Sequence, residues 1–458
     1  MSRLIQNRYA APVLLIVLGI ATRFAFIWHP NQVVFDEVHF GKFVSAYFTG
    51  NYFFDIHPPL GKLLIALPAY FWDFQPGFDF KSIGETYMDS SHIALRLIPN
   101  LFGALLPVCI FFLVRSLRGS TMAAFFAGIT LVLENAILVQ SHFILVDSML
   151  FFFGFFALAL FFFYRNYSKN TAHLFGAGVF FALSFSVKWT GISFLTLAWI
   201  VSVWDLRQRF GEKMLLIKRL GLLAVALVLV PLFVYMSVFA VHFSLLPKSG
   251  KGDGFMSKSF LKTLSGSSVE GNNSITPLNF GGKFIELNKR MYSSNASLSA
   301  KHSYSSEFYS WPVMLRPIFY WSKQTSPGVR ARIYLLGNPL IWWIACGAVI
   351  GGLIFWKTNP SETKWFLYLG WYLNFFPFFY IKRVMFLYHY FPSLIFSIVI
   401  MSLFFFDGPQ VLKRYRKILF IALMSLFAIG YVFFSPLTYG LPLSSEQYDL
   451  RVWMKGWK

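Results

Sequence analysis

Charged residues are scarce in this chain of 458 residues. Only 13% of the residues are charged, against about 25% in ordinary globular proteins, whereas 57% are hydrophobic and 20% are aromatic. The mean hydropathy is +0.58. These values exclude a typical soluble globular protein. They predict an integral membrane protein built from apolar helices.

Cysteine and the common metal and nucleotide motifs are also scarce. The chain has two cysteines, Cys109 and Cys346, and both lie within apolar runs, where a thiol normally acts as a small packing residue. They indicate no disulfide framework. No HExxH-type histidine pair occurs, and Gly61-Lys62 lacks the rest of a phosphate-binding loop. We therefore predict no cofactor and no essential metal. The sequence does not decide whether a divalent metal binds.

Acidic residues are outnumbered by basic ones, with 19 Asp and Glu against 40 Lys and Arg and a formal net charge of +21. Such a charge is common in proteins that bind nucleic acid. Here, however, the basic residues lie mainly between apolar runs, as the positive-inside rule predicts for a membrane protein. We therefore expect membrane lipid, and no nucleic acid, as a partner.

Long apolar runs dominate what is present. A helix needs about 20 apolar residues to cross a bilayer, and on this rule the sequence predicts an all-α, polytopic membrane protein with about eleven transmembrane helices. Their ranges are near 10–28, 92–114, 121–139, 144–164, 172–187, 191–204, 220–242, 333–356, 364–380, 385–406 and 418–436. The first run lacks a small-residue cleavage site followed by a polar start, so we expect it to be an uncleaved span.

Lysine and arginine predict the orientation, with the N-terminus inside and the C-terminus outside. Long translocated loops do not count toward this rule. The loops assigned to the inside carry 17 cations, namely Arg3, Arg8, Arg115, Arg118, Arg165, Lys169, Arg207, Arg209, Lys213, Lys218, Arg219, Lys357, Lys364, Lys413, Arg414, Arg416 and Lys417. The short outer turns carry only Lys188, Lys382 and Arg383. Two long segments, near 29–91 and 243–332, are then expected outside.

The predicted organisation has three parts. Residues 1–242 form an N-terminal transmembrane region with a catalytic first loop at 29–91, residues 243–332 form a second outer loop, and residues 333–458 form a C-terminal transmembrane region with an outer tail. The Gly- and Ser-rich start of the second loop is expected to be mobile, and its aromatic end, 302–321, to be ordered at the membrane face. We expect the second loop to pack on the first.

The sharpest candidate for chemistry is Asp36-Glu37, in the segment FDEVHFGKF. Ionisable groups beside a membrane are costly to leave unpaired and often mark functional sites. A carboxylate in a dry, aromatic-lined loop can have a raised pKa and remove a proton from a hydroxyl group. The structural alternative is that Asp36 caps a following helix, with Glu37 in its first turn. The dipeptide alone leaves both interpretations open.

Several cations and histidines on the outer side are candidates for binding a substrate. Two prolines after His57 hold it on a stiff segment, where it can contact a phosphate, brace Asp36 or anchor the loop. Arg96, at the outer end of the second span, can hold an anion, pair with an acid of the first loop or snorkel. Lys188 is either a phosphate clamp or an interfacial anchor. Arg23 is a weaker candidate of the same kind.

Further candidates lie toward the C-terminus. His302 and Arg316 belong to an aromatic loop that is suited to sugar stacking or peptide docking, or else to an interfacial helix. Arg383 is expected on the outer face, where the phosphate of a lipid would lie, and is a candidate for binding it. His389 follows in the same segment, KRVMFLYHYFPSL.

Two acids between the third and fourth spans are expected to have structural or supporting roles. Glu134 and Asp147 flank an outer turn in the segment LENAILVQSHFILVD. Acids at helix N-termini commonly cap the helix. We therefore do not count them among the substrate-binding residues.

Together these segments resemble the protein O-mannosyltransferases, glycosyltransferases of the GT-C class in glycosyltransferase family 39. The resemblance rests on FDEVHFGKF, HPPLGK, LENAILVQSHFILVD, SVKWTG, HSYSSEFYSWPVMLRP, KRVMFLYHYFPSL and the tail TYGLPLS, and it covers most of the chain. His142 stands where the family usually has arginine, and Ser303 where it usually has proline. The chain also lacks the hydrophilic MIR module, so its layout is closer to bacterial members.

The resemblance implies a function for these residues. Asp36 would be the catalytic base, supported by Glu37, and Arg383, Arg96 and Lys188 would hold the phosphate of a polyprenyl-phosphate-mannose donor. Mannose would pass with inversion to Ser or Thr of an exported polypeptide. The reaction would take place at the outer face of the bacterial cytoplasmic membrane rather than in the endoplasmic reticulum. The sugar, the prenyl carrier, the acceptor proteins and the oligomeric state stay open.

Two other functions also stay open. A GT-C enzyme of this layout can transfer another lipid-linked sugar to a lipid or glycan, as in aminoarabinose transfer to lipid A. A transporter of a lipid or an anion would be a different class of protein. Transporters usually show inverted repeats and charges near the membrane midplane. In this sequence the acids cluster in outer loops and no repeat is visible.

Overall fold

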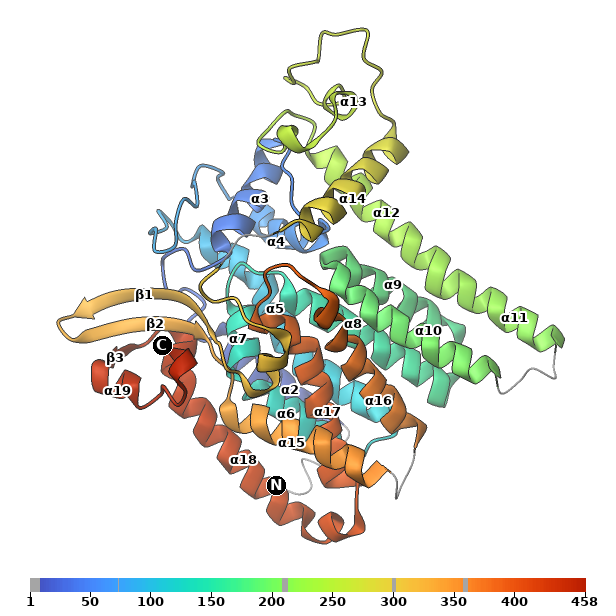
Figure 1. Ribbon diagram of the computed structural model, residues 1–458, viewed down its shortest axis with the longest axis vertical. Coiled ribbons are helices and arrows are strands. Elements are labelled where there is room, and N and C mark those ends of the chain that lie inside the picture. Colours follow the sequence, from blue (N-terminus) through green and yellow to red (C-terminus); the bar gives the residue numbers. More distant parts are fainter. Residues whose placement is uncertain (1–8, 73, 208–212, 299–301, 357–360) are drawn as a thin grey trace.

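The computed structural model describes residues 9–72, 74–207, 213–298, 302–356 and 361–458. It shows a bundle of helices with loops and short helices gathered at one end and a β-hairpin projecting from one side (Figure 1). Four cations that supported the predicted orientation, Arg3, Arg8, Arg209 and Lys357, lie outside the described residues. The orientation itself stays a prediction.

The α-helices follow one another along nearly the whole chain. They are α2 (Ala10–Phe24), α3 (Glu37–Thr49), α4 (Leu60–Phe71), α5 (Ser91–Ser116), α6 (Thr121–Val132), α7 (Asn135–His142), α8 (Asp147–Phe163), α9 (Thr171–Val187), α10 (Ile192–Arg207), α11 (Lys213–Ala224), α12 (Val230–Leu245), α13 (Lys258–Leu261), α14 (Phe280–Ala296), α15 (Pro339–Trp356), α16 (Glu362–Leu373), α17 (Phe391–Asp407), α18 (Gln410–Tyr439) and α19 (Ser445–Asp449). Helix α5 packs against α2, α4, α6 and α8, so it forms the centre of the N-terminal half.

The chain is a multi-pass integral membrane protein by the length and composition of its helices. Within the described residues, six helices are long and apolar enough to cross a membrane, or up to seven if one bent pair counts as a single span. Four shorter apolar helices, among them α2 and α4, accompany them. The expected span at 364–380 is instead α16, followed by a 3-10 turn, Phe376–Tyr380. The larger number of spans expected from the sequence stays a prediction.

The expectation of an all-α fold is wrong in one place. Strands β1 (Ile318–Ser326), β2 (Val329–Leu335) and β3 (Pro442–Ser444) form an antiparallel sheet in the order β1-β2-β3. A Pro327-Gly328 turn joins the first two strands, and Gly328 has a φ of +74° that glycine adopts without strain. The continuous aromatic run at the start of β1 hides the alternation of a strand. The prediction places β1 and the start of β2 in the second outer loop, and the last three residues of β2, 333–335, in the span expected at 333–356.

Helices α6 and α7 replace a span that the sequence predicts as continuous. Their axes differ by 59°. Glu134 caps α7 by accepting a hydrogen bond of 2.6 Å from the N–H of Ile137. Arg23, buried on α2, donates to the carbonyl oxygens of Leu131 and Val132 at 2.6 and 2.9 Å. Both side chains satisfy backbone groups freed by the break, so the capping role expected for Glu134 is confirmed, and Arg23 is structural.

The second outer loop packs on the first, as expected. The N–H of Tyr52 donates to the carbonyl of Lys248 at 2.8 Å, and the N–H of Gly252 donates to the carbonyl of Tyr52 at 3.2 Å. A separate apolar cluster fills the contact between the two loops and α12, and includes Tyr47, Tyr52, Phe53, Tyr235, Phe239, Met256, Phe260, Leu287 and Met291. The Gly- and Ser-rich start of the second loop thus has a defined backbone path.

Candidate active site

Glu37 is the anchor of the first loop. Its carboxylate is fully buried and accepts two hydrogen bonds from the guanidinium of Arg96, at 2.8 and 3.0 Å. It also accepts hydrogen bonds from the Tyr87 hydroxyl at 3.0 Å and from the N–H groups of Val34 and Ile144 at 2.8 and 3.0 Å. Five donors on two oxygens leave this carboxylate no capacity for a reacting group. Glu37 therefore fits a supporting role and cannot act as a base.

Arg96 is part of the same anchor. Besides Glu37, it donates to the carbonyl oxygens of Ile27 and Pro30, at 3.3 and 3.0 Å, and it is fully buried. The guanidinium of Arg96 also stands over the ring of Phe143, 5.0 Å from its centroid. The expectation that Arg96 holds a substrate phosphate is therefore not supported by its position. Its donors are occupied by the protein, because the first loop folds back over the end of α5.

Asp36 has a different environment, although it precedes Glu37 directly. It stands at the N-cap position of α3, but its side chain makes no capping hydrogen bond. The residue is half-buried. Burial raises the pKa of Asp36 to about 6, with smaller contributions from the charges of Asp147 and Asp55, while His39 and Lys188 act in the opposite direction. The structural alternative, a helix cap, therefore does not describe this carboxylate.

A series of hydrogen-bonded polar side chains connects Lys188 to the β-sheet. The Lys188 ammonium donates to both oxygens of Asp147, at 2.8 and 3.0 Å. Gln140 donates to Asp147 at 2.7 Å and accepts from the Tyr320 hydroxyl at 2.5 Å. Tyr320 in turn stacks on Phe35, with ring centroids 4.1 Å apart and 7° between the planes. Lys188 therefore faces inward in an ion pair and is not a simple interfacial anchor.

His57 lies beside three cations. Burial, together with Lys188, Lys62 and Arg383, lowers the pKa of His57 well below its ordinary value. The imidazole is therefore neutral at neutral pH and can donate one hydrogen bond and accept another. Lys62 holds this segment in place, because it forms an ion pair with Asp55 and donates to the carbonyl of His57 at 2.9 Å.

Arg383 differs from Lys62 and Lys188, because those two cations each form an ion pair with an acid. Its guanidinium is half-buried and contacts the Nε2 atom of His389 at 3.5 Å. Among the described residues, no Asp or Glu oxygen lies within ion-pair distance of Arg383. The ring of His389 stacks on Trp311, at a centroid distance of 5.9 Å, so its position is fixed. An arginine in this state is suited to bind an oxyanion.

His302 and Arg316 lie at the rim of the site. The exposed His302 ring meets Phe386 edge-on at 5.0 Å, and the N–H of Ser306 donates to the carbonyl of Met385 at 3.0 Å. Arg316 donates to the carbonyl of Ser303 at 2.7 Å. These contacts hold the 302–306 turn against the segment that carries Arg383.

The structure thus brings together five of the predicted residues. Asp36, His57, Lys188, Arg383 and His389 each experience the charge of at least one other member of this group. We call this group the charged cluster. It comes from four separate segments of the chain, since Arg383 and His389 lie in the same one. It combines one carboxylate with a lysine, an arginine and two histidines. Such a set can take a proton and hold a phosphate at once.

Some participants were missed by reasoning from the sequence. Gln140 and Tyr320 link the sheet to Asp147, and Tyr388 presents its ring to the Lys188 ammonium at 5.3 Å. Gln140 and Asp147 stand seven positions apart, on either side of the turn after α7, which is the only trace of their contact in the sequence. Tyr320 was hidden in an aromatic run. Among the described residues, no group of three or more His, Cys, Asp or Glu side chains is arranged to hold a metal ion.

Comparison with known proteins gives a family. A model described as "Dolichyl-phosphate-mannose-protein mannosyltransferase" matches residues 13–247, and a model of the "C-terminal four TMM region of protein-O-mannosyltransferase" matches residues 280–457. Dolichyl-phosphate-mannose–protein mannosyltransferase 4 of Candida albicans is 36% identical over 274 residues, covering 56% of this chain and 36% of that protein. Protein O-mannosyl-transferase 2 of Danio rerio is 33% identical over 288 residues, covering 61% and 38%. The match therefore spans just over a third of these relatives.

A solved structure agrees with these matches. The protein O-mannosyltransferase Pmt1-Pmt2 complex of S. cerevisiae, bound to the sugar donor, contains a chain with a TM-score of 0.88 and 20% sequence identity. The alignment covers 100% of this chain and 94% of that one. At this identity the likeness shows a common fold. With the fold shared and a family model matching residues 13–247, this chain belongs to the dolichyl-phosphate-mannose-protein mannosyltransferase family.

Proposed function

We propose that this protein transfers mannose from a polyprenyl-phosphate-mannose donor to the hydroxyl group of Ser or Thr in an exported polypeptide. Family membership supports the reaction class. The observation that carries the proposal for this chain is the environment of Asp36. It is a half-buried carboxylate that makes no cap, beside a neighbour, Glu37, that is fully bonded.

Asp36 would act as the general base. A base works best when its pKa lies near the pH of the reaction, and burial moves the pKa of Asp36 to about 6. At neutral pH the carboxylate is mostly ionised and still basic enough to accept a proton from a hydroxyl group. The oxygen of the Ser or Thr hydroxyl group would attack C1 of mannose while the proton of that hydroxyl group passes to Asp36.

Arg383 would bind the donor phosphate. In the proposed step, the bond between C1 of mannose and the phosphate oxygen breaks, and the bond from C1 to the Ser or Thr oxygen forms on the opposite face. The electron pair of the broken bond stays on the phosphate, which leaves as polyprenyl phosphate with an added negative charge. A half-buried guanidinium that has no carboxylate partner within the described ranges is well suited to stabilise that charge.

Lys188, His57 and His389 would complete the phosphate site. Lys188 remains paired with Asp147, so it contributes a partly compensated positive charge. His57, neutral because of its surroundings, can donate a hydrogen bond to a phosphate oxygen. The rim residues His302 and Arg316 lie on the exposed side, where an acceptor polypeptide would approach.

The placement in the membrane is part of the proposal. The charged cluster lies at the end of the bundle where the two long loops meet, and the charge bias of the sequence puts these loops outside. We propose that the N-terminus is inside, that the C-terminus is outside, and that the sugar is transferred at the outer face of a bacterial cytoplasmic membrane. The short apolar helices α2, α9 and α15 would then also be membrane spans.

A transfer assay tests the proposal. Purified protein in lipid vesicles is given polyprenyl-phosphate [14C]mannose and a Ser- and Thr-rich peptide, and wild type is compared with Asp36→Asn. We expect label on the peptide, and we expect the variant to lose it while it folds normally. Asp79→Asn is the matched control, since Asp79 is an exposed acid of the same loop that pairs with the exposed Lys81.

Three outcomes would contradict parts of the proposal. Full activity of Asp36→Asn would show that Asp36 is not the general base. Label on a lipid or glycan in place of the peptide would indicate the other type of GT-C enzyme. No transfer to any acceptor would remove mannose transfer as the function.

A further inference from the structure

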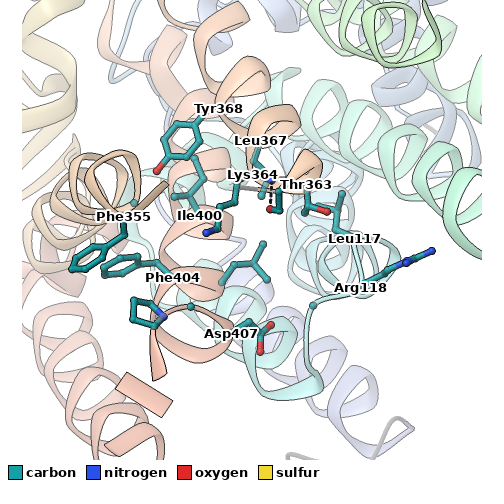
Figure 2. Close-up of a pocket in the computed structure, with 16 residues that line it drawn as sticks. Leu117, Arg118, Phe355, Thr363, Lys364, Leu367, Tyr368, Ile400, Phe404 and Asp407 are labelled. Carbon is teal, nitrogen blue, oxygen red and sulfur yellow. Dashed lines mark hydrogen bonds between the residues drawn. The ribbon is translucent and has the colours of Figure 1, made fainter. Parts of the chain in front are cut away.

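Tyr388 lies beside the charged cluster, and the proposed reaction gives it no role. It belongs to the 3-10 turn Leu387–Tyr390, directly before α17. The cavity of about 260 Å³ shown in Figure 2 lies at the other end of α17, beside Phe404 and Asp407. Helix α17 has 17 residues and therefore spans about 25 Å at 1.5 Å per residue. Tyr388 thus belongs to the candidate active site and not to that cavity.

Three neighbours hold the ring of Tyr388 in place. Its centroid lies 4.7 Å from that of His389 and 5.5 Å from that of Phe386, with 23° and 22° between the planes. The Lys188 ammonium lies 5.3 Å from the same centroid. Stacked rings and a cation at an aromatic face both stabilise one orientation of a side chain. The protein therefore fixes the direction of the Tyr388 hydroxyl group before any substrate binds.

The hydroxyl group of Tyr388 is available to a ligand. Within the described ranges, no hydrogen bond joins it to another protein atom, and its oxygen is not among the fully buried polar atoms that lack a partner. The residue is half-buried, so this oxygen is reached from the open side of the site. By contrast, the hydroxyl group of the neighbouring Tyr320 donates to Gln140 at 2.5 Å. An open phenol hydroxyl group can donate one hydrogen bond and accept another.

The Tyr388 hydroxyl group lies near both proposed ends of the reaction. The ring of His389, which stacks on Tyr388, contacts the guanidinium of Arg383 at 3.5 Å. The charge of Asp36 acts on the same hydroxyl group, as does that of Arg383. In a displacement with inversion, the base and the leaving phosphate stand on opposite sides of C1 of the sugar. A group that is near both Asp36 and Arg383 therefore lies beside the sugar ring, close to C1.

The chemistry of the sugar selects one contact at this place. Besides the bond that breaks, C1 of a hexose adjoins the ring oxygen and the carbon that carries the 2-hydroxyl group. The ring oxygen shares the positive charge of an oxocarbenium-like transition state, so a hydrogen-bond donor is unfavourable there. A hydrogen bond to the 2-hydroxyl group becomes stronger in such a transition state. The 2-hydroxyl group also distinguishes mannose, where it is axial, from glucose, where it is equatorial.

We propose that Tyr388 forms a hydrogen bond with the 2-hydroxyl group of the donor sugar and is a specificity-determining residue for mannose over glucose. This inference rests on the proposed function, because Asp36 and Arg383 define where the sugar lies. A phenol that is held in one orientation can bond well to an axial or to an equatorial hydroxyl group, and not to both. The contact is made with the donor alone, so it exists before an acceptor binds.

Donor binding tests the inference without any acceptor peptide. The full chain in detergent is titrated by calorimetry with polyprenyl phosphate and with its mannose, glucose and 2-deoxyglucose derivatives, the last of which lacks the 2-hydroxyl group. We expect the wild type to bind the mannose derivative about 3- to 10-fold more tightly than the other two sugar derivatives, which is the contribution of one hydrogen bond. Tyr388→Phe should bind the three sugar derivatives equally and bind polyprenyl phosphate as the wild type does.

Tyr380→Phe is the matched control for this variant. Tyr380 lies in the same segment before α17 and is 81% exposed, so its loss of a hydroxyl group should change none of the four affinities. Tyr388→Phe keeps the stacked ring, and its Tm should stay near that of the wild type. Tyr388→Met also removes the hydroxyl group and provides the same comparison if Tyr388→Phe does not fold.

The outcomes separate this inference from the proposed function. If the affinities follow the expected pattern and no mannose reaches a peptide, the proposed function is wrong and the contact of Tyr388 stands. If Tyr388→Phe binds the mannose derivative as tightly as the wild type, or loses affinity equally for all four ligands, the inference is wrong. Equal binding of the mannose and 2-deoxyglucose derivatives by the wild type would also overturn it.

Discussion

Two pairs of charged residues near the first loop differ in how far their hydrogen-bonding groups are already used by the protein. On the anchor side, Glu37 and Arg96 are fully buried, and their polar atoms are bonded to each other and to the loop backbone. On the open side, Asp36 makes no cap, and Arg383 contacts a histidine at 3.5 Å and has no acid within ion-pair distance among the described residues. The first pair fixes the loop, and the second pair is left with unused capacity. The neighbouring carboxylates Asp36 and Glu37 therefore have different proposed roles.

The difference has a physical cause. A buried charge is stable only when it is paired and hydrogen-bonded, so Glu37 and Arg96 must use all their contacts within the protein. Asp36 and Arg383 are half-buried and keep access to an incoming ligand. Substitutions on the two sides should therefore change different properties, stability on one side and activity on the other.

The largest effect is expected for Asp36→Asn. Loss of a general base typically lowers a rate by about 10²- to 10⁴-fold. The turnover number for mannose transfer to peptide should fall by this factor, whereas the thermal unfolding of the purified variant should stay close to that of the wild type. A variant with a much lower Tm would mean that Asp36, like Glu37, mainly stabilises the fold, which would contradict the distinction between the two acids.

Glu37→Gln should instead destabilise the protein. It leaves Arg96 buried without its counter-charge, and breaking a buried pair in this way typically costs about 3–5 kcal/mol. We expect a large drop in Tm and a poor yield of folded protein in detergent. Arg96→Gln should behave similarly. A stable Glu37→Gln with low activity would mean that Glu37 takes part in the chemistry.

Arg383→Gln should weaken the use of donor without unfolding the protein. A hydrogen bond to a charged group contributes about 1.5–3 kcal/mol, so kcat/KM for the donor should fall roughly 10- to 150-fold. Lys382→Gln, the exposed neighbour, is the matched control and should change little. A similar loss in both variants would show that the region needs only a general positive potential.

The pH dependence of transfer should follow Asp36. Because burial raises the pKa of this carboxylate from 3.8 to about 6, it becomes protonated as the pH falls through 6, and the protonated form cannot accept a proton. The value of kcat/KM should be level above that pH and decline about tenfold per pH unit below it. A profile that is flat down to pH 4.5 would contradict both the base and its burial.

Tyr320→Phe should give the smallest change. It removes one hydrogen bond, from Tyr320 to Gln140, and keeps the stack on Phe35. Such a bond contributes about 0.5–1.5 kcal/mol, so we expect a few-fold loss of activity through a less well-held Asp147–Lys188 pair. The comparison variant Tyr309→Phe changes an exposed tyrosine of the second loop and should be neutral.

Part of the fold could be predicted from the sequence. The run expected at 92–114 is α5, Ser91–Ser116, and the run expected at 172–187 is α9, Thr171–Val187. These helices follow from local apolar composition and length. The bend between α6 and α7 could not be predicted in this way, because Arg23, a residue far away in the sequence, satisfies the backbone at the break.

The candidate site was predictable as a list and not as an arrangement. Asp36, His57, Lys188 and Arg383 stand out because polar groups are rare in so apolar a chain. Nothing in their spacing separates Arg96, which pairs with Glu37, from Arg383, which pairs with no acid in the part of the chain that the structure describes.

The sequence by itself therefore determined the class of protein, most of its helices and the segments that carry the candidate site, since these depend on local composition. The tertiary structure decided which carboxylate is open, which cation is compensated and where the sheet meets the site. The reason is that a charge takes its properties from its partners. Here the partners come from far along the chain, as Arg96 does for Glu37 and Lys188 does for Asp147.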